Sequence, residues 1–228
     1  MGIAIEEMAI NAGHSISFKI DKSNSDQLSN LNSSNTNVAI EFSDPSSAVT
    51  NIIYCLKNNI PVVSGTTGWL DQWKDVEQVC TENKGTFFYA SNYSIGVNLF
   101  FKLNEYLAKL MKDQDYKVSM EEIHHTEKKD SPSGTSITLG EPILKVRNLN
   151  EWVNEETDNP KQLGIVSKRE PGVPGTHTIT YSSEIDEIKM THTAHGRKGF
   201  AKGALSVAEW IVQTQAKGML SMHDFLKL

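Results

Sequence analysis

Cysteine is scarce in this chain: Cys55 and Cys80 are its two thiols among 228 residues. Two cysteines are too few for a disulfide framework or a four-cysteine zinc site, so the sequence favours a reducing, cytoplasmic compartment. No apolar run reaches the roughly 18 residues that a membrane-spanning helix needs. A signal peptide is not expected, because Glu6 and Glu7 interrupt the start of the chain and no apolar core follows a basic segment. The sequence therefore predicts no membrane partner.

Positive charge is in deficit, with 22 Lys and Arg against 28 Asp and Glu and a net charge of −6. A general nucleic-acid-binding protein normally carries a basic excess, so we expect no nucleic-acid partner. Hydrophobic residues make up 38% and charged residues 22%, which is ordinary for a globular protein. A chain of this length forms one large domain or two modest ones.

The first half of the sequence alternates helix and strand patterns. The expected helices cover residues 2–12, 46–58 and 71–82, and the expected strands cover residues 15–20, 38–42, 62–64 and 86–90. Residues 22–36 are rich in Ser and Asn and predict a mobile loop. Strands that alternate with helices in this way indicate βαβ units and a parallel sheet covered on both faces.

The pattern changes after an expected helix over residues 96–112. Strand-like segments follow over residues 116–125, 164–169, 176–183 and 187–194. Successive strands of this kind predict a second, α+β domain with a mostly antiparallel sheet. A helix is expected from Ser133, with a kink or an end near residue 141 because of Gly140 and Pro142. A last helix over residues 200–215 is expected to return to the first domain.

The densest group of polar residues is the segment 121–135, EEIHHTEKKDSPSGT. A helix that begins after Ser133 exposes free backbone N–H groups and the positive end of its dipole, so Ser133, Gly134 and Thr135 are suited to hold a carboxylate. Gly134 permits a close approach of the backbone to such a ligand. Lys128 supplies a positive charge, and a histidine can deliver a proton near neutral pH.

The same segment has simpler interpretations. The run SPSGT is also typical of a turn and a helix N-cap, and EKK of a solvated loop. Adjacent histidines on a strand point to opposite faces, and we identify no cysteine or acidic partner at ligand spacing, so we expect no metal site. His177, His192 and His195 are expected on the sheet surface or in the core rather than in catalysis.

Six motifs, spread in order over the chain, are similar to those of one family. They are Phe42-Ser43-Asp44-Pro45, Gly65-Thr66-Thr67-Gly68, Ala90-Ser91-Asn92-Tyr93-Ser94-Ile95-Gly96-Val97-Asn98, His124-His125-x-x-Lys128-x-Asp130-x-Pro132-Ser133-Gly134-Thr135, Arg169-x-x-x-Val173-x-Gly175-x-His177, and His192-x-Ala194-x-x-Arg197-x-x-Phe200-Ala201-x-Gly203-Ala204. The family that they resemble is dihydrodipicolinate reductase (4-hydroxy-tetrahydrodipicolinate reductase) of lysine and diaminopimelate biosynthesis.

The resemblance implies an α/β fold with a Rossmann-like parallel-sheet domain and an α+β substrate domain with a mostly antiparallel sheet. Residues 1–94 with 197–228 are expected to form the dinucleotide-binding domain. Residues 95–196 are expected to form the substrate-binding and oligomerisation domain. A homotetramer built through the second sheet is also implied.

The resemblance further implies an NAD(P)H-dependent oxidoreductase that reduces a cyclic unsaturated dicarboxylate, 4-hydroxy-tetrahydrodipicolinate, to tetrahydrodipicolinate. His124 would donate the proton, and Lys128 would be a second donor or the electrostatic partner of the ring nitrogen. Hydride arrival puts negative charge on the ring, and a nearby cation and acid lower that barrier. The expected substrate contacts are His125, Ser133, Gly134, Thr135 and Arg197.

On the cofactor side, both NADH and NADPH remain open. Asp21 follows the second expected strand, where a dinucleotide fold has its ribose-binding acid, and Lys22 could accept a 2′-phosphate; an ordinary turn is the alternative for Asp21. The resemblance brings the loop Gly65–Thr67 to the nicotinamide, and a plain βα turn is the alternative there. The expected cofactor-binding residues are Gly2, Asp21, Lys22, Gly65, Thr66, Thr67, Ala90, Ser91, Asn92 and Tyr93.

The start of the chain departs from a complete dinucleotide fingerprint, which needs a strand, then G-x-G-x-x-G, then a helix. Met1-Gly2 resembles only the last two residues of that loop, so we expect the first strand and the leading glycines to be missing. Three explanations are open: a sequence that omits an N-terminal segment, an internal start, or another segment that fills the gap.

Two other functions remain as alternatives. A different two-domain amino-acid dehydrogenase could share the first domain, but not the His-His-Lys and Ser-Gly-Thr motif. A truncated, inactive homologue would bind a dicarboxylate but no nucleotide.

Overall fold

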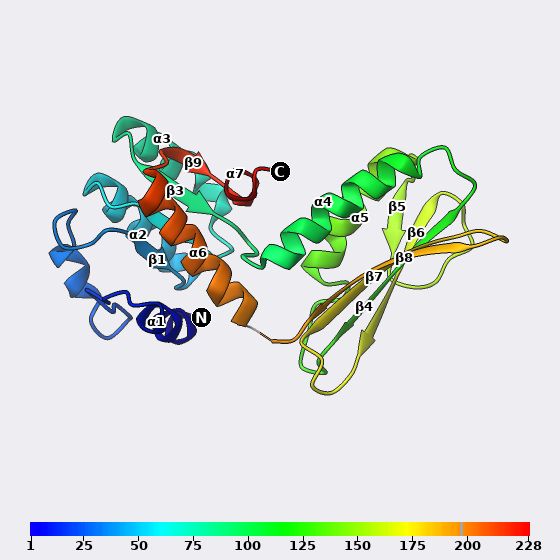
Figure 1. Ribbon diagram of the computed structural model, residues 1–228, viewed down its shortest axis with the longest axis horizontal. Helices are drawn as coiled ribbons and strands as arrows, with labels where there is room; N and C mark the ends of the chain where they lie inside the picture. The colour runs from blue at the N-terminus through cyan, green and yellow to red at the C-terminus, as the bar shows by residue number, and fades with distance from the viewer. Residues whose placement is uncertain (197) are drawn as a thin grey trace. The chain divides into compact units, whose positions relative to one another are not determined.

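The computed structural model describes residues 1–196 and 198–228, which fall into two compact units (Figure 1). Met1–Ile95 and Lys198–Leu228 form the first unit, and the chain between them forms the second. Each unit has its own sheet and its own apolar core. Within the described residues, no helix is long and apolar enough to cross a membrane.

The first unit contains a sheet of four parallel strands in the order β1-β2-β3-β9. The strands are β1 (Ala39–Glu41), β2 (Val62–Ser64), β3 (Thr86–Tyr89) and β9 (Gly218–Leu220). The helices are α1 (Gly2–Asn11), α2 (Pro45–Lys57), α3 (Trp73–Glu82), α6 (Lys198–Thr214) and α7 (Met222–Leu226), with short 3-10 helices η1 (Ser25–Asn30) and η2 (Leu70–Gln72).

Both faces of this sheet are buried, and neighbouring residues of a strand point to opposite faces. Val62 and Phe87 join the apolar core that includes α2 and α3, whereas Val63 and Phe88 join the core that includes α1, α6 and α7. The predicted parallel sheet with helices on both faces is therefore confirmed. In such a sheet the carboxyl ends of the strands share one edge, where ligands bind.

The second unit contains a five-stranded sheet in the order β5-β6-β4-β7-β8. Its elements are α4 (Ile95–Leu110), β4 (Lys117–His124), α5 (Gly134–Arg147), β5 (Glu151–Val153), β6 (Gln162–Arg169), β7 (Gly175–Ser182) and β8 (Glu187–Ala194). Phe100 of α4 and Leu139 and Ile143 of α5 pack on Met120 and Ile165 of the sheet, so both helices cover one face.

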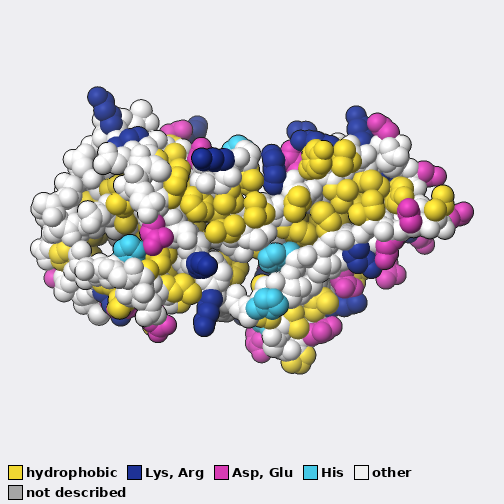
Figure 2. Space-filling model, in the orientation of Figure 1, with side chains coloured by type: hydrophobic (Ala, Val, Ile, Leu, Met, Phe, Trp, Pro, Cys, Tyr) yellow, Lys and Arg dark blue, Asp and Glu magenta, His cyan; other side chains and the backbone are white. Residues whose placement is uncertain are grey.

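The outward side of α4 is apolar. Exposed side chains recur on it at helical spacing, and Figure 2 shows an apolar surface over this helix. These residues are Leu99, Leu103, Tyr106 and Leu110.

The second sheet is mixed rather than mostly antiparallel. β4 pairs with β7, and β7 with β8, in antiparallel fashion, but β4–β6 and β6–β5 are parallel. Parallel strands require the chain to return to the starting end of the sheet, which α5 does between β4 and β5 and residues 154–161 do between β5 and β6.

Several local predictions differ from the structure. Residues 15–20 do not form a strand: a strand needs a hydrogen-bonded neighbour, and this segment pairs with none in the described part of the chain, although Phe18 and Ile20 pack on the core. α5 does not end near residue 141 but continues past Pro142 to Arg147. The short elements β5, β9 and α7 were not expected.

Candidate active site

The buried face of β4 changes from apolar to ionisable along the strand. Val118 and Met120 lie in the core of the second unit, and Glu122 and His124 continue the same buried row because alternate residues share a face. The sequence thus places an acid and an imidazole side by side at one end of the sheet.

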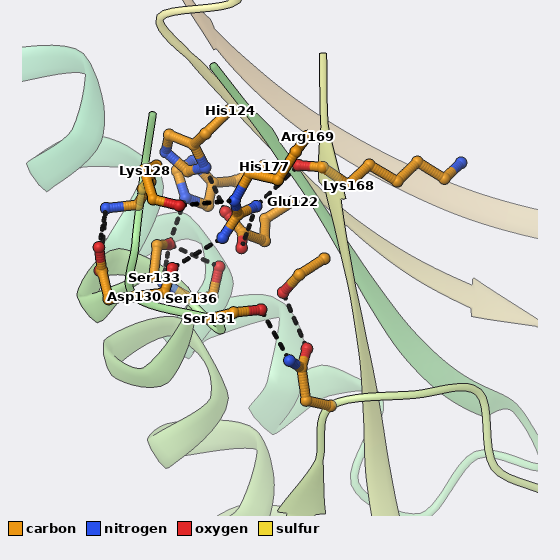
Figure 3. Close-up of polar contacts among 12 residues, drawn as sticks. Glu122, His124, Lys128, Asp130, Ser131, Ser133, Ser136, Lys168, Arg169 and His177 are labelled. Atoms are coloured by element: carbon orange, nitrogen blue, oxygen red, sulfur yellow. Dashed lines mark hydrogen bonds and ion pairs between the residues drawn. The ribbon is translucent and has the colours of Figure 1, made fainter. Parts of the chain in front are cut away.

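Glu122 lies between His124 and Arg169 (Figure 3). Its side chain has no exposed surface; Oε1 is 3.0 Å from Nη1 of Arg169, and Oε2 forms an ion pair with Nδ1 of His124. Burial raises the pKa of Glu122, but hydrogen bonds from His124, Ser167 and Arg169 outweigh it and lower the pKa to about 2. The Glu122 carboxylate is therefore charged at neutral pH.

His177 of β7 connects His124 to α5. Its ring lies edge-on to that of His124, with ring centroids 5.1 Å apart, and its Nε2 is 3.1 Å from Oγ of Ser133. Burial, followed by the proximity of His124, lowers the pKa of His177 to about 4. His177 is therefore neutral at neutral pH and adds no second positive charge beside His124.

The low pKa of His177 predicts a pH-dependent stability. The ordinary pKa is 6.5, so between pH 6.5 and 4 the unfolded chain binds a proton that the folded chain does not, and stability falls as pH falls. We expect His177 to account for a loss of about 2 kcal/mol in the free energy of unfolding between pH 7 and pH 5. His177→Gln, whose amide can still bond Ser133, should lack this loss.

Urea unfolding at the two pH values measures this difference. His125→Gln, which removes a less buried histidine of the same unit, is the control and should retain the wild-type pH dependence. Equal pH dependence in wild type and His177→Gln would contradict the assignment.

α5 begins with the N-cap that the sequence predicts. Oγ of Ser133 accepts the backbone N–H of Ser136 at 3.2 Å and lies 2.9 Å from its hydroxyl. A Cβ added at Gly134 would meet no atom within 4 Å, so there is room for a ligand next to the backbone of this first turn. Thr135 follows in the same turn and is partly exposed. The predicted carboxylate-binding role of these residues remains a proposal.

Lys128 contacts a carboxylate near this helix end. Its Nζ is 2.8 Å and 2.9 Å from the two carboxylate oxygens of Asp130. The pKa of Asp130 is lowered, first by this hydrogen bond and to a smaller extent by the backbone N–H of Gly134. Lys128 and the first residue of α5 thus act together on one carboxylate.

Arg169 fixes the loop that carries Lys128. Besides its ion pair with Glu122, it donates through Nη2 to the carbonyl of Asp130 at 2.7 Å and through Nε to the carbonyl of Lys128 at 3.3 Å. A guanidinium group binds several acceptors in one plane, so the Arg169 side chain fixes the position of the loop relative to Glu122.

Two predicted substrate contacts lie elsewhere. His125 is the first residue after β4, and its Nδ1 is 2.9 Å from a carboxylate oxygen of Glu127. The structure therefore does not bring His125 into the network around Glu122. Arg197 lies outside the described residues.

Nε2 of His124 faces the start of β7. A Cβ added at Gly175 would lie 2.9 Å from this nitrogen, and Gly175 has a φ of +157°. In the described part of the chain, no side chain hydrogen-bonds Nε2. Because Nδ1 is held by Glu122, Nε2 is the nitrogen of His124 that can exchange a proton with a substrate.

Among the described residues, Glu122, His124 and His177 are the group of acid and histidine side chains close enough to hold a metal ion, with their ligand atoms within 4.8 Å of one another. Glu122 is an acidic partner that was not expected from the sequence. However, Glu122 already pairs with Arg169, and Nε2 of His177 contacts Ser133. We therefore interpret the group as a hydrogen-bonded network rather than as a metal centre.

In the first unit, several predicted cofactor residues meet at the carboxyl end of the parallel sheet. Thr66 is buried, and its hydroxyl donates to Glu41 at 3.0 Å while accepting the backbone N–H of Ser43 at 2.8 Å. Ser64 also donates to Glu41, at 2.6 Å. The buried Glu41 carboxylate thus joins the loops after β1 and β2. A Cβ at Gly65 would lie 2.1 Å from the ring of Phe42, which explains the glycine.

The segment after β3 lies against the same loop. The Tyr93 hydroxyl donates to the carbonyl of Ser64 at 2.7 Å, and the Ala90 backbone N–H approaches that carbonyl at 3.3 Å. Asn92 accepts the backbone N–H of Ser94 at 2.9 Å. Ser91, like Thr67 of the loop after β2, is exposed. The structure therefore brings the predicted segments 65–67 and 90–93 together.

The remaining predicted cofactor residues are exposed. Asp21 accepts the backbone N–H and the hydroxyl of Ser23, at 2.7 Å and 2.6 Å, as a turn residue does. Lys22 forms an ion pair at 3.0 Å with Asp44, the N-cap of α2. Gly2 is the first residue of α1.

Among the residues of these clusters that were not predicted site residues are Glu41, Glu122, Arg169 and His177. Glu122 could have been found, because it precedes His124 by one strand repeat. Arg169 and His177 belong to a quoted motif, but only the strand register shows that they face β4. Glu41 gives no signal in the sequence beyond its place at a strand end.

Two family domains match successive parts of the chain. The N-terminal domain of dihydrodipicolinate reductase matches residues 2–93, and the C-terminal domain of dihydrodipicolinate reductase matches residues 96–226. The chain belongs to the dihydrodipicolinate reductase family. The resemblance predicted from the six motifs is therefore confirmed.

Individual family members are similar over most of their length. The 4-hydroxy-tetrahydrodipicolinate reductase of Christiangramia forsetii is 48% identical, over 99% of this chain and 93% of the relative. That of Buchnera aphidicola is 35% identical, over 90% and 77%. A solved structure, the dipicolinate-bound dihydrodipicolinate reductase of Paenisporosarcina sp. TG-14, is 25% identical with a TM-score of 0.67, over 81% of this chain and 71% of that one.

Dihydrodipicolinate reductases are pyridine-nucleotide-dependent oxidoreductases of lysine and diaminopimelate biosynthesis. The predictions of an oxidoreductase of this pathway and of a Rossmann-like α/β fold are confirmed. A different amino-acid dehydrogenase and an inactive homologue are not favoured by these relatives.

Proposed function

We propose that this chain reduces 4-hydroxy-tetrahydrodipicolinate to tetrahydrodipicolinate with NADH or NADPH, with His124 as the proton donor and Lys128 as the cation beside the substrate. The names of the relatives support the reaction. The unit Met1–Ile95 with Lys198–Leu228 would bind the nucleotide, and the other unit the substrate.

The observation that carries the proposal is the position of the Asp130 carboxylate. Lys128 donates hydrogen bonds to it, and the backbone N–H of Gly134 contributes to the lowering of its pKa. A carboxylate at a helix N-terminus beside an ammonium group is what a dicarboxylate substrate offers. In the complex, a substrate carboxylate would take over these partners from Asp130, with Ser133 and Thr135 beside it.

His124 suits a proton donor. Nδ1 is engaged by a charged carboxylate, which orients the ring, while Nε2 faces Gly175 at the start of β7. The neutral His177 beside it avoids a repelling charge. Lys128 would balance the negative charge that develops on the substrate ring.

The first unit offers groups that fit a dinucleotide. The loop Gly65–Thr67 and the segment 90–93 meet at the carboxyl edge of the sheet, where Thr66 donates to Glu41 and Tyr93 donates to the carbonyl of Ser64. Asp21 would bind the ribose, and Lys22 a 2′-phosphate if one is present. When bound, the nicotinamide supplies the hydride.

We further propose a cytoplasmic homotetramer. The two free thiols are buried, which suits a reducing compartment. β8 is an edge strand of eight residues, and such an edge can pair with another chain. Assembly through this sheet would leave the buried network of β4 intact.

Turnover of the purified chain tests the proposal. We expect oxidation of NADH or NADPH that depends on 4-hydroxy-tetrahydrodipicolinate, and calorimetric binding of pyridine-2,6-dicarboxylate. Dicarboxylate binding with no turnover by either nucleotide would favour the inactive homologue. The absence of both dicarboxylate binding and turnover would refute the proposed site.

A further inference from the structure

We infer that Glu122 and Arg169 are positioning residues for the proton donor: together they hold His124 in the tautomer with Nδ1 protonated and fix the Lys128 loop beside it. This inference rests on the proposed function, since it concerns the residue that would deliver the proton.

The Glu122 carboxylate is fully buried, and each of its two oxygens has an ion-pair partner. One oxygen pairs with Arg169 and the other with Nδ1 of His124. With a pKa of about 2 it accepts hydrogen bonds and does not donate them at neutral pH. Nδ1 of His124 must therefore carry a hydrogen, which leaves Nε2 to exchange the proton.

Arg169 links Glu122, and through it His124, to the loop after β4 and to β6. Its guanidinium neutralises Glu122 and donates to the carbonyls of Lys128, Asp130 and Lys168. These carbonyls belong to the loop after β4 and to β6, so one side chain couples the acid of β4 to the loop with the proposed cation. A lysine could neutralise the same carboxylate but could not reach several acceptors in one plane.

Several charged and titratable groups face His124 from the elements packed around it. Glu122 of the same strand is anionic, Arg169 of β6 is cationic, and Lys128 of the loop is paired with Asp130. His177 of β7, with its pKa lowered to about 4, is neutral. Removal of the Glu122 charge would leave Nδ1 of His124 without the carboxylate acceptor that fixes its hydrogen.

The chain contains a matched control on the same two strands. Glu121 and Lys168 form an ion pair on the other face of the sheet, with side chains 37% and 50% exposed, against 0% and 22% for Glu122 and Arg169. An exposed pair contributes little to stability and lies on the face opposite His124. Glu121→Gln therefore removes the same charge from the same strand without touching the network.

The experiment compares the pH profiles of kcat for Glu122→Gln, Glu121→Gln and wild type. We expect kcat of Glu122→Gln to be lower by about 10- to 100-fold, with an unchanged KM for the nucleotide, because the proton donor loses the partner that orients it. Glu121→Gln should follow the wild-type profile. Profiles that coincide for both variants would overturn the inference.

Nitrogen NMR of the histidine rings tests the tautomer independently of turnover. We expect the neutral His124 ring, assigned by its loss in His124→Gln, to carry its hydrogen on Nδ1 in wild type and to distribute it over both nitrogens in Glu122→Gln. A wild-type ring with its hydrogen on Nε2 would refute the inference even in an active enzyme. Inactive wild type with Nδ1 protonated would instead refute the proposed function alone.

Arg169→Lys completes the test if Glu122→Gln does not fold. This variant retains the positive charge beside Glu122 but loses the fork to the loop carbonyls. We expect kcat to fall about 10-fold or more with an unchanged KM for the nucleotide, because a small displacement of Lys128 weakens its action. Wild-type kcat in Arg169→Lys would contradict the positioning role of Arg169.

Discussion

Lys128→Ala is expected to lower kcat by about 100- to 1000-fold, the cost of losing one preorganised group that stabilises developing charge. Nucleotide affinity should change far less, because Lys128 belongs to the second unit and the candidate nucleotide groups to the first. The reason for the loss in kcat is that the ammonium charge matters most as the hydride arrives and negative charge develops on the substrate ring. Steady-state kinetics with either nucleotide, together with calorimetry of nucleotide binding, measures both quantities.

The adjacent Lys129 provides the control for this experiment. It is exposed, whereas Lys128 is partly buried and paired with Asp130. Lys129→Ala removes the same charge one position along the chain and should retain wild-type kcat. An unchanged kcat in Lys128→Ala, or an equal loss in both variants, would refute the assigned role of Lys128.

His124→Gln is expected to have the second large effect. General acid catalysis by a positioned side chain contributes typically 10²–10⁴-fold, so we expect kcat to fall by about 100-fold or more. Glutamine retains an amide hydrogen-bond donor close to the position of the imidazole, so binding of pyridine-2,6-dicarboxylate should persist. The adjacent His125→Gln, outside the buried network, is the control and should lose much less activity in the same assay.

Most helices and strands could be predicted from the sequence because each has its own periodicity. β2 and β8 begin and end at the predicted residues, and α2 begins one residue before its predicted start. The prediction of a strand at residues 15–20 was wrong, because a strand depends on a neighbouring strand that the local pattern does not reveal. The parallel pairing of β4 with β6 escaped prediction for the same reason.

The candidate site also contains residues that could be predicted from a local motif and residues that could not. His124, Lys128 and the Ser133–Thr135 turn lie close together in the sequence, so their motif was readable there. Glu122 lies on the same face of β4 as His124, but its role depends on the ion pair with Arg169. The position of Arg169 follows from the pairing of β4 with β6, in which His124 lies opposite Arg169. Contacts of this kind depend on the paired strands and not on any one segment.

Single-turnover reduction with nucleotide and substrate bound in advance isolates the chemical step from binding and product release, so it measures the contribution of His124 as proton donor. We expect His124→Gln to bind both ligands as wild type does and to oxidise the bound nucleotide about 100-fold more slowly. Oxidation of the bound nucleotide by His124→Gln at the wild-type rate would contradict the assignment of His124 as the proton donor.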